Sequence, residues 1–316
     1  MKLTILDGHA VNPGDCPWDS FKEIDGMTVS VFERTPQDKV IERIGDSDII
    51  LLNKINLGEE VFSACPNLKY IGVLATGYNV IDLEAAKKHN ITVTNIPSYS
   101  TDAVAQHVFA FILHFTNLVS LHNDSVQKGD WVKCPDFCYW NDSLTELAGK
   151  TLGIFGYGHI GKKVAQIAKA FGMNVICCTR TPKPDMPPKV SFEELLKTSD
   201  FVSLHAPLTP QTKNIINKDS ISLMKKSAIL INTARGGFIV EKDLAEALKQ
   251  HRIKGYAADV VAEEPMKKDN PLLNCPNCII TPHIAWAPKE TRLRLQKIAL
   301  ENLKHWLQGT PQNVVN

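Results

Sequence analysis

The stretch Gly156-Tyr157-Gly158-His159-Ile160-Gly161 indicates the fold, because of what lies on both sides of it. An apolar, strand-like run at 151–155 precedes it, and a helical pattern with apolar residues on one face follows it. A second strand-like run then occupies 174–178. Strand, glycine turn, helix and strand in this order form the context that a dinucleotide-binding fingerprint requires.

Each of the three glycines has a physical role in such a turn. The first permits the tight turn, the second lets the backbone approach a pyrophosphate, and the third lets helix and strand pack closely. Unpaired N–H groups at the start of the helix, together with the helix dipole, then hold the diphosphate. We therefore predict that the chain binds NAD or NADP, with cofactor contacts from all six residues of the turn: Gly156, Tyr157, Gly158, His159, Ile160 and Gly161.

Length and charge narrow the class of protein. A chain of 316 residues is long enough for two domains of ordinary size. Its 35 basic and 34 acidic residues give a net charge of +1, which offers no electrostatic reason to expect a nucleic-acid or membrane partner. The start of the chain, Met1 to Asp7, reads as a β-strand rather than a signal peptide, and no apolar run reaches membrane-spanning length. We expect a cytoplasmic protein.

The eight cysteines do not indicate a disulfide framework in a chain of this size. Cys275 and Cys278 have the spacing of half a zinc site, but no second pair with ligand spacing accompanies them. Cys177 and Cys178 lie in a predicted buried strand, where cysteine behaves as a small hydrophobic residue. We predict no metal site.

Strand-like and helical segments alternate along the chain, which indicates the α/β class with parallel sheets covered on both faces. The strands are expected at 3–6, 29–32, 49–52, 70–74 and 91–94, and then at 151–155, 174–178, 201–204, 228–233, 255–259 and 278–281. A stretch at 97–101 is a plausible crossing between the two series. The last helix, expected near 288–308, has a proline at its start and Gly309 just beyond its end, as helix termini prefer.

Three residues able to do chemistry follow predicted strands of the second series. Arg235 follows the strand near 228–231, Glu264 follows the strand near 255–258, and His283 follows the strand near 278–280. In open α/β sheets, ligands bind in the crevice outside the carboxyl ends of the strands. We therefore expect these three side chains to converge where the nicotinamide of the cofactor lies.

The chemistry of the three residues fits the reduction of a 2-oxo acid. A planar guanidinium holds a carboxylate with paired hydrogen bonds, which is the role expected for Arg235. A histidine titrates in the range needed to protonate the oxygen that becomes negative as hydride arrives, which is the role expected for His283. A carboxylate beside that histidine, here Glu264, orients the ring and favours its protonated form.

With these motifs, the sequence resembles the D-isomer-specific 2-hydroxyacid dehydrogenase family over nearly its whole length. The resemblance also rests on the stretches Ala75-Thr76-Gly77-Tyr78-Asn79-Val80-Ile81-Asp82 and Ser100-Thr101-Asp102-Ala103-Val104-Ala105-Gln106-His107. It implies that Arg235, Glu264 and His283 form the catalytic set. It further implies that substrate is bound by backbone N–H groups around Thr76 and Gly77 together with Arg235 and His283. The cofactor site would be lined by Thr101, His205, Pro207, Thr233, Ala234 and Asp259.

The same resemblance implies the architecture. A Rossmann cofactor domain, residues 100–287, would be inserted in a flavodoxin-like substrate domain, and both would be doubly wound parallel sheets. Residues 1–99 would form the first part of the substrate domain, and the C-terminal helix within 288–316 would complete it. The two crossings, near 97–100 and 286–288, would act as a hinge. Family members are commonly homodimers joined through their cofactor domains.

Two softer motifs look most like glycerate dehydrogenases, also called hydroxypyruvate reductases. They are WVKCPDFCYW at 131–140 and the lead-in LAGK at 147–150. The expected reaction is therefore the reduction of hydroxypyruvate or glyoxylate to a D-2-hydroxy acid. Two alternatives remain open: another 2-oxo acid such as phosphohydroxypyruvate, and a nucleotide-sensing binding protein similar to the transcriptional corepressors built on this scaffold.

The sequence departs from NAD-preferring members at the end of the second strand of the cofactor domain. Those members place an acidic residue there to bind the ribose hydroxyls. In this chain the position is Thr179, followed by Arg180. A threonine removes the repulsion of a 2′-phosphate, and an arginine can bind one. We therefore predict that Thr179 and Arg180 contact the cofactor and that NADP is favoured, with NAD as the alternative.

Overall fold

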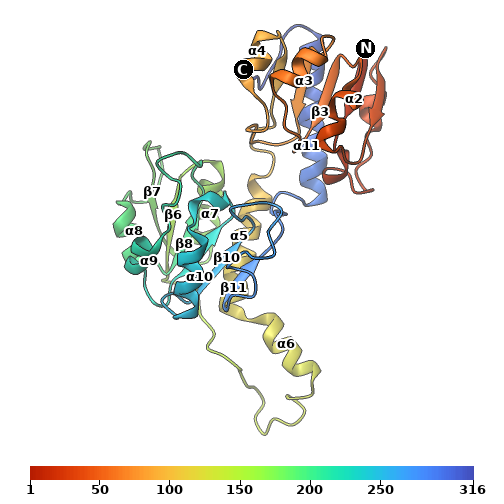
Figure 1. Ribbon diagram of the computed structural model, residues 1–316. Helices are drawn as coiled ribbons and strands as arrows, with labels where there is room; N and C mark the ends of the chain where they lie inside the picture. The colour runs from red at the N-terminus through yellow and green to blue at the C-terminus, as the bar shows by residue number, and fades with distance from the viewer. The chain divides into compact units, whose positions relative to one another are not determined.

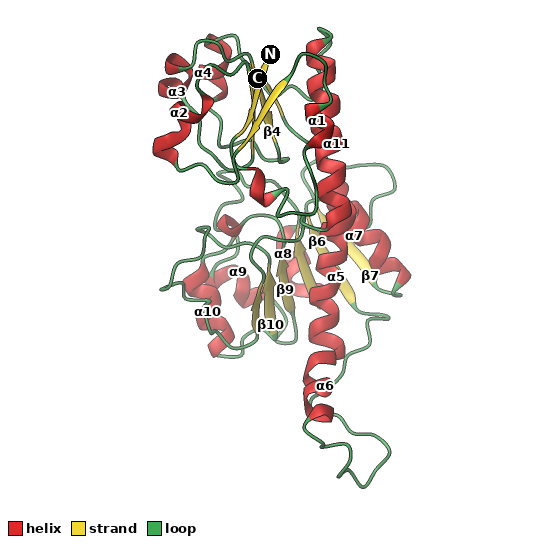
Figure 2. Ribbon diagram, turned by 90° about the vertical axis from the view of Figure 1, so that its right-hand side faces the viewer, coloured by secondary structure: helices red, strands yellow, loops and turns green.

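The computed structural model describes residues 1–316, which form two compact units. Unit 1 combines Met1–Ser100 with Trp286–Asn316, and unit 2 is the intervening segment Thr101–Ala285. Each unit contains one sheet in which every strand pair is parallel, with helices on both faces (Figure 1, Figure 2). The predicted class, two doubly wound α/β domains, is confirmed.

The sheet of unit 1 has the strand order β2-β1-β3-β4-β5, which is the flavodoxin-like order. Its strands are β1 (Lys2–Ile5), β2 (Thr28–Val31), β3 (Ile49–Leu52), β4 (Tyr70–Val73) and β5 (Thr92–Thr94). The unit's helices are α1 (Asp19–Lys22), α2 (Val40–Ile44), α3 (Glu59–Ala64), α4 (Leu83–Lys88) and α11 (Lys289–Leu307), with short 3-10 turns η1 (Gly8–Ala10) and η2 (Gln37–Lys39).

The central strand β3 shows how the sheet of unit 1 is buried on both faces. Ile50 and Leu52 belong to the core beneath α2, α3 and α4, while Ile49 and Leu51 belong to the core beneath α1 and α11. Successive side chains of a strand point to opposite faces, so a strand that is apolar at every position must have helices on both sides.

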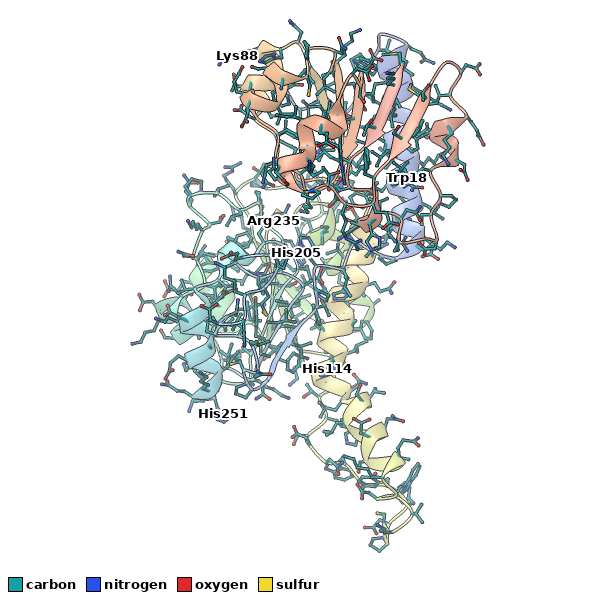
Figure 3. All side chains as sticks on the ribbon, turned by 45° about the vertical axis from the view of Figure 1, so that its right-hand side comes forward. Trp18, Lys88, His114, His205, Arg235 and His251 are labelled. Carbon is teal, nitrogen blue, oxygen red and sulfur yellow. The ribbon has the colours of Figure 1, made fainter.

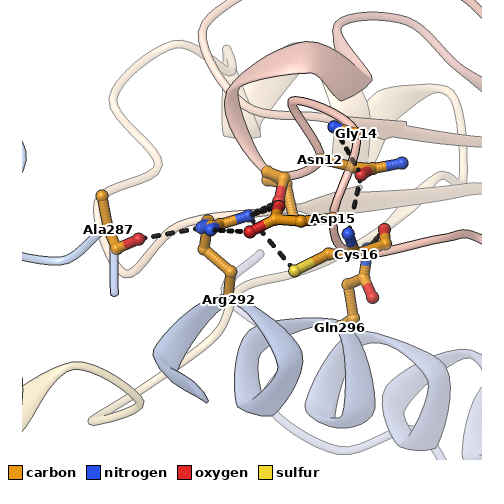
Figure 4. Close-up of polar contacts among 8 residues, drawn as sticks. Asn12, Gly14, Asp15, Cys16, Ala287, Arg292 and Gln296 are labelled. Carbon is orange, nitrogen blue, oxygen red and sulfur yellow. Dashed lines mark hydrogen bonds and ion pairs between the residues drawn. The ribbon is translucent and has the colours of Figure 1, made fainter. Parts of the chain in front are cut away.

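A buried arginine ties the C-terminal helix to the start of the chain (Figure 4). The guanidinium of Arg292 on α11 donates to both carboxylate oxygens of Asp15, at 2.5 and 2.8 Å, and to the carbonyl oxygens of Val11 and Ala287. Its hydrogen bonds hold the pKa of Asp15 at about 2. The next turn of α11 adds a hydrogen bond from Gln296 Nε2 to the carbonyl of Cys16. These contacts join residues some 280 positions apart into one unit.

The sheet of unit 2 has the order β11-β10-β9-β8-β6-β7. Its strands are β6 (Thr151–Phe155), β7 (Asn174–Cys178), β8 (Phe201–Leu204), β9 (Ile229–Asn232), β10 (Gly255–Ala258) and β11 (Cys278–Ile280). A single parallel bridge between Cys177 and Lys189 marks a rudimentary strand beyond β7, which completes the Rossmann order. The strand order reverses between β6 and β8, so the crevice for a ligand is expected at their carboxyl ends.

Two groups of helices cover the sheet of unit 2. They are α5 (Thr101–Asn117) and α7 (His159–Ala170) on one face, and α8 (Phe192–Thr198), α9 (Lys218–Leu223) and α10 (Glu241–Lys249) on the other, with a 3-10 turn η3 (Gly236–Phe238). Residues 118–146, which comprise α6 (Val119–Gln127) and the loop after it, extend away from this sheet and are called the arm below (Figure 1).

No single helix is long and apolar enough to cross a membrane. Helices α5 and α6 have the length and composition of a membrane span only when they are taken together. The pair is bent by 53° at the break between the two helices.

All eleven predicted strands are present, and each agrees with the observed bounds to within one residue at either end. The last helix also lies where its termini predict, from Pro288 at the N-cap to Gly309, whose φ of +76° stops the helix. Glycine adopts that left-handed conformation without a steric cost.

Candidate active site

The glycine turn closes the carboxyl end of β6 against the end of β8. Gly156 has a φ of +95°, and a Cβ added there would lie 2.4 Å from the backbone nitrogen of Ala206. A Cβ on Gly161 would lie 2.3 Å from the carbonyl oxygen of Gly156, so this glycine lets α7 approach β6. A Cβ on Gly158 would meet nothing within 4 Å. Gly158 is therefore the one of the three whose missing side chain leaves room for a ligand.

The first turn of α7 carries free donors. The backbone N–H groups of His159, Ile160 and Gly161 make no hydrogen bond, and the N-cap residue Gly158 has no side chain to satisfy them. Such a helix start attracts a phosphate. The Tyr157 side chain is buried against α5 and α7, so its backbone is the part that faces the turn, whereas the His159 side chain is exposed.

A second observation also fits a dinucleotide. The hydroxyl of Thr233, just after β9, is buried but has no hydrogen-bond partner. A buried polar group without a partner is costly, and a bound ligand would satisfy it. Three features fit the cofactor predicted from the sequence: the open space beside Gly158, called the cradle below, the free N–H groups of α7, and this hydroxyl. A bound nicotinamide would supply or accept the hydride.

The residues predicted to discriminate between NAD and NADP follow β7. Thr179 is half-buried, and its hydroxyl makes one long hydrogen bond of 3.5 Å to the carbonyl of Thr181. Arg180 is exposed and has no hydrogen bond or ion pair. Its guanidinium is therefore free to bind an anion at the edge of the sheet.

His205 directly follows β8, and its Nε2 lies 2.8 Å from the Ser203 hydroxyl. Burial lowers the pKa of this histidine to about 3, so its ring is neutral at physiological pH. His205 and Arg235 lie at the same end of unit 2, whereas His251, which precedes β10, lies at the opposite end (Figure 3). Pro207 is exposed in the loop after β8, and Thr101 begins α5.

The loop after β9 presents Arg235. Fully buried Asn232, the last residue of β9, accepts a hydrogen bond from the Ala234 N–H and donates one to the Arg235 carbonyl. A Cβ on Gly236 would overlap the backbone of Val261, at 1.9 Å, so this loop packs directly on the loop that follows β10. The Arg235 side chain itself is exposed, and its Nη1 bonds only the carbonyl of Ala234.

Glu264 and His283 are brought together although 19 residues separate them. Glu264 Oε2 lies 2.7 Å from His283 Nδ1, and the two side chains are 36% and 30% exposed. The other carboxylate oxygen of Glu264 accepts the Val261 N–H at 3.2 Å. Glu264 contacts Nδ1, and the Nε2 atom of His283 makes no hydrogen bond within the protein.

The backbone at His283 is constrained by Asp259, the residue after β10. His283 has a φ of +56°, which L side chains rarely adopt. The Asp259 carboxylate is almost completely buried and accepts the N–H groups of Ile284 at 2.8 Å and Ala285 at 2.7 Å. Asp259 thus holds the chain immediately after His283, whereas the sequence suggested only a role at the cofactor.

The stretch expected to bind substrate in unit 1 follows β4. The Thr76 hydroxyl donates to the carbonyl of Ile96 at 2.7 Å, and the Thr76 carbonyl accepts from Asn95 Nδ2 at 2.8 Å. The backbone N–H groups of Thr76 and Gly77 make no hydrogen bond within the protein. This turn has a fixed conformation with two free donors.

Sequence reasoning assigned no role to several residues that shape these loops. Besides Asn232, Glu241 at the start of α10 accepts the Ala262 N–H at 2.8 Å and the side chain of Asn270 at 3.0 Å, so it fixes the loop that carries Glu264. His107 and Thr281 also belong to this group. Two signals could have been used: His107 stands in the stretch 100–107 that carries the family resemblance, and Thr281 is two residues before His283.

Comparison with known proteins identifies the family of the chain. Residues 109–285 match the family model described as D-isomer specific 2-hydroxyacid dehydrogenase, NAD binding domain. The chain is 46% identical to a hydroxypyruvate reductase of Blautia hydrogenotrophica over the full length of both chains. It is 42% identical to a glycerate dehydrogenase of Methylorubrum extorquens, with 89% of each chain covered.

The fold is likewise shared with solved structures. One is an acyclic imino acid reductase (Bsp5) in complex with NADPH and D-Arg, which has a TM-score of 0.87 and 33% identity, with all of both chains covered. The roles of Arg235, Glu264 and His283 remain predictions. The chain belongs to the D-isomer specific 2-hydroxyacid dehydrogenase family and is an oxidoreductase that uses a nicotinamide cofactor.

Proposed function

We propose that this enzyme reduces hydroxypyruvate or glyoxylate to the D-2-hydroxy acid, with NADPH as the preferred reductant. The observation that carries the proposal is the 2.7 Å contact between His283 Nδ1 and Glu264 beside the loop of Arg235. The similar hydroxypyruvate reductase and glycerate dehydrogenase support the choice of substrate.

The residues of the chain divide the work as follows. Arg235 binds the substrate carboxylate with two parallel hydrogen bonds from its planar guanidinium, which is exposed and therefore accessible to a ligand. The N–H groups of Thr76 and Gly77 donate further hydrogen bonds to the substrate. His283 gives the proton on Nε2 to the carbonyl oxygen as the hydride arrives at carbon. Glu264 holds the ring through Nδ1 and so orients Nε2 toward the carbonyl oxygen.

The preference for NADPH rests on the free guanidinium of Arg180 and on Thr179, which stands where an acidic residue would repel a 2′-phosphate. A solved structure similar to this chain holds NADPH. The rest of the proposed contacts come from the glycine turn 156–161 and from residues at the ends of the strands and the start of α5: Thr101, Thr179, His205, Pro207, Thr233, Ala234 and Asp259.

An assay of several 2-oxo acids with both cofactors tests substrate and cofactor together. We expect the highest kcat/KM with hydroxypyruvate or glyoxylate and NADPH, and a lower value with phosphohydroxypyruvate. The double substitution Thr179→Asp with Arg180→Ala should shift the preference toward NADH, because it adds a negative charge and removes a positive one. Lys183→Ala, which removes another exposed cation of the same loop, should not.

Equal or better kcat/KM of the unmodified enzyme with NADH would contradict the cofactor assignment but not the reaction. Binding of NADPH without turnover of any 2-oxo acid would instead favour the nucleotide-sensing alternative.

We further propose that the enzyme is a cytoplasmic homodimer joined through unit 2. All eight cysteines are free, as is usual in a reducing compartment. The arm exposes large apolar side chains, among them Val132 at 90%, Phe137 at 88% and Trp140 at 66%. It is internally ordered, since Trp131 Nε1 donates to the Phe137 carbonyl. Several large apolar side chains exposed together on one segment are typical of a protein interface.

A second copy of unit 2 offers a matching surface on α5 and α7. A groove there is lined by Asp102, Gln106, Phe109, Ala110, Leu113, Lys163 and Ile167. The ring of Phe109 stacks on that of Phe171, which is 40% exposed. In a two-fold dimer, the arm of each copy would cover the groove of the other. The same contact would therefore form two times, and the apolar surfaces of both copies would be buried.

Light scattering should therefore give the mass of a dimer. Ala110→Glu, which places a charge on the exposed floor of the groove, and Phe137→Ser on the arm should each shift the protein toward the monomer. Leu273→Ser, which changes an apolar side chain 46% exposed elsewhere on unit 2, should leave the dimer intact. A monomeric unmodified protein would contradict the proposal.

A further inference from the structure

The turn at 281–285, which presents His283, is anchored on both sides of the histidine to one carboxylate. Downstream of His283, Ile284 and Ala285 donate their N–H groups to Asp259. Upstream of it, the hydroxyl of Thr281 donates to Asp259 Oδ1 at 2.6 Å. The backbone N–H of His283 closes the turn on the Thr281 carbonyl at 2.9 Å. Asp259 therefore fixes the chain on both sides of His283, whose φ of +56° lies in the left-handed region.

A residue far away in the sequence extends this anchor to helix α5. Nε2 of His107 lies 3.0 Å from the Thr281 hydroxyl oxygen and 3.9 Å from Asp259 Oδ1. The single hydrogen of that hydroxyl is directed at Asp259, so His107 must be the donor, through a protonated Nε2. Burial lowers the pKa of His107, which keeps the ring neutral with that one N–H. The ring packs edge-on against Phe111, with centroids 4.5 Å apart, and this contact fixes its orientation.

The hydrogen bonds thus run in one direction, from His107 through Thr281 to Asp259. A hydroxyl that accepts from an imidazole polarises its own O–H and binds a carboxylate more strongly. Without the Thr281 hydroxyl, Asp259 would keep its hydrogen bonds to the N–H groups of Ile284 and Ala285 but would no longer hold the chain before His283. The strained backbone at His283 could then relax, and its ring would leave the orientation that faces the substrate.

We propose that Thr281 and His107 are positioning residues that hold His283 in its reactive orientation through Asp259. The proposal rests on the proposed role of His283 as proton donor. Neither residue is among the proposed substrate or cofactor contacts, and Asp259 keeps its hydrogen bonds to Ile284 and Ala285 without them. Their removal should therefore lower the rate of the chemical step and leave binding of cofactor largely unchanged.

The test compares substitutions that differ only in the hydroxyl. Thr281→Val keeps the shape of the side chain and removes the donor, so kcat should fall about ten-fold while the Kd for NADPH stays within about two-fold. Thr281→Ser keeps the hydroxyl and should recover most of the rate. His107→Leu should lower kcat in the same way. Combined with Thr281→Val, it should add little, because the two residues act through one hydrogen-bonded chain.

A control and a second readout separate positioning from general destabilisation. Thr116 on α5 is also buried, but its hydroxyl bonds only the Ile112 carbonyl and Asn117, so Thr116→Val should leave kcat unchanged. Hydrogen exchange of the amides of Ile284 and Ala285 should be faster in Thr281→Val than in the unmodified protein, and unchanged in Thr116→Val.

Unchanged kcat in both Thr281→Val and His107→Leu would overturn the proposal, and so would a Thr281→Ser enzyme as slow as Thr281→Val. Either result together with an inactive His283→Ala enzyme would leave the proposed function intact. An active His283→Ala enzyme would instead remove the proposed role of His283, whatever the Thr281 variants show.

Discussion

Replacing His283 by alanine should lower kcat by about 10²–10⁴-fold, the usual contribution of a general acid. The reason is geometric: the ring is held through Nδ1 by Glu264 at 2.7 Å, and its Nε2 remains as the donor at the carboxyl end of β11. Affinity for NADPH should change little, because the free N–H groups of α7 and the open cradle at Gly158 are untouched. Single-turnover kinetics and cofactor titration measure the two effects separately.

A matched control for this prediction is His251→Ala. That histidine lies at the opposite end of unit 2, so its loss should not affect turnover (Figure 3). Near-normal turnover of His283→Ala would remove histidine from the proposed mechanism.

Arg235→Lys should lower kcat/KM by about 10- to 100-fold even though the positive charge is kept. An ammonium group cannot make the two parallel hydrogen bonds of a guanidinium, and a hydrogen bond to a charged partner contributes about 1.5–3 kcal/mol. Asn232 holds the backbone of this loop through Ala234 N–H and the Arg235 carbonyl, so the substitution should not disturb the fold.

The substrate itself supplies a second test of the carboxylate clamp. The unmodified enzyme should strongly prefer a 2-oxo acid over its amide, and Arg235→Lys should reduce that preference. Equal activity of the unmodified enzyme on acid and amide would show that no carboxylate is bound at this position. Arg252→Lys is a suitable control, because Arg252 bonds only the backbone carbonyls of Ser222 and Met224 at the end of α9.

The order of secondary structure followed from local signals. Runs of apolar residues of strand length, separated by helical patterns, located every strand of both sheets, because a strand buried on both faces is apolar at nearly every position. The glycine turn could be read in the same way, since a side chain at Gly156 or Gly161 would collide with the backbone, which leaves few other residues possible at these two positions. Arg235, Glu264 and His283 were recognisable because each follows a predicted strand in a parallel sheet.

The supporting contacts could not be found from the sequence, because they join residues that no local period connects. Asp259 holds Ile284 and Ala285 from 25 and 26 positions away, and His107 reaches Thr281 across 174. Arg292 reaches Asp15 across 277 positions. Each of these polar groups finds its partner only after the chain has folded, and nothing in the local sequence names that partner.

The sequence by itself determined the strands and the glycine turn and predicted the catalytic set, because these depend on local sterics and on the ends of parallel strands. Tertiary structure alone decided how that set is held. Pairing of distant polar groups selects one conformation for the His283 turn, with a backbone φ of +56° that no residue other than glycine prefers by itself.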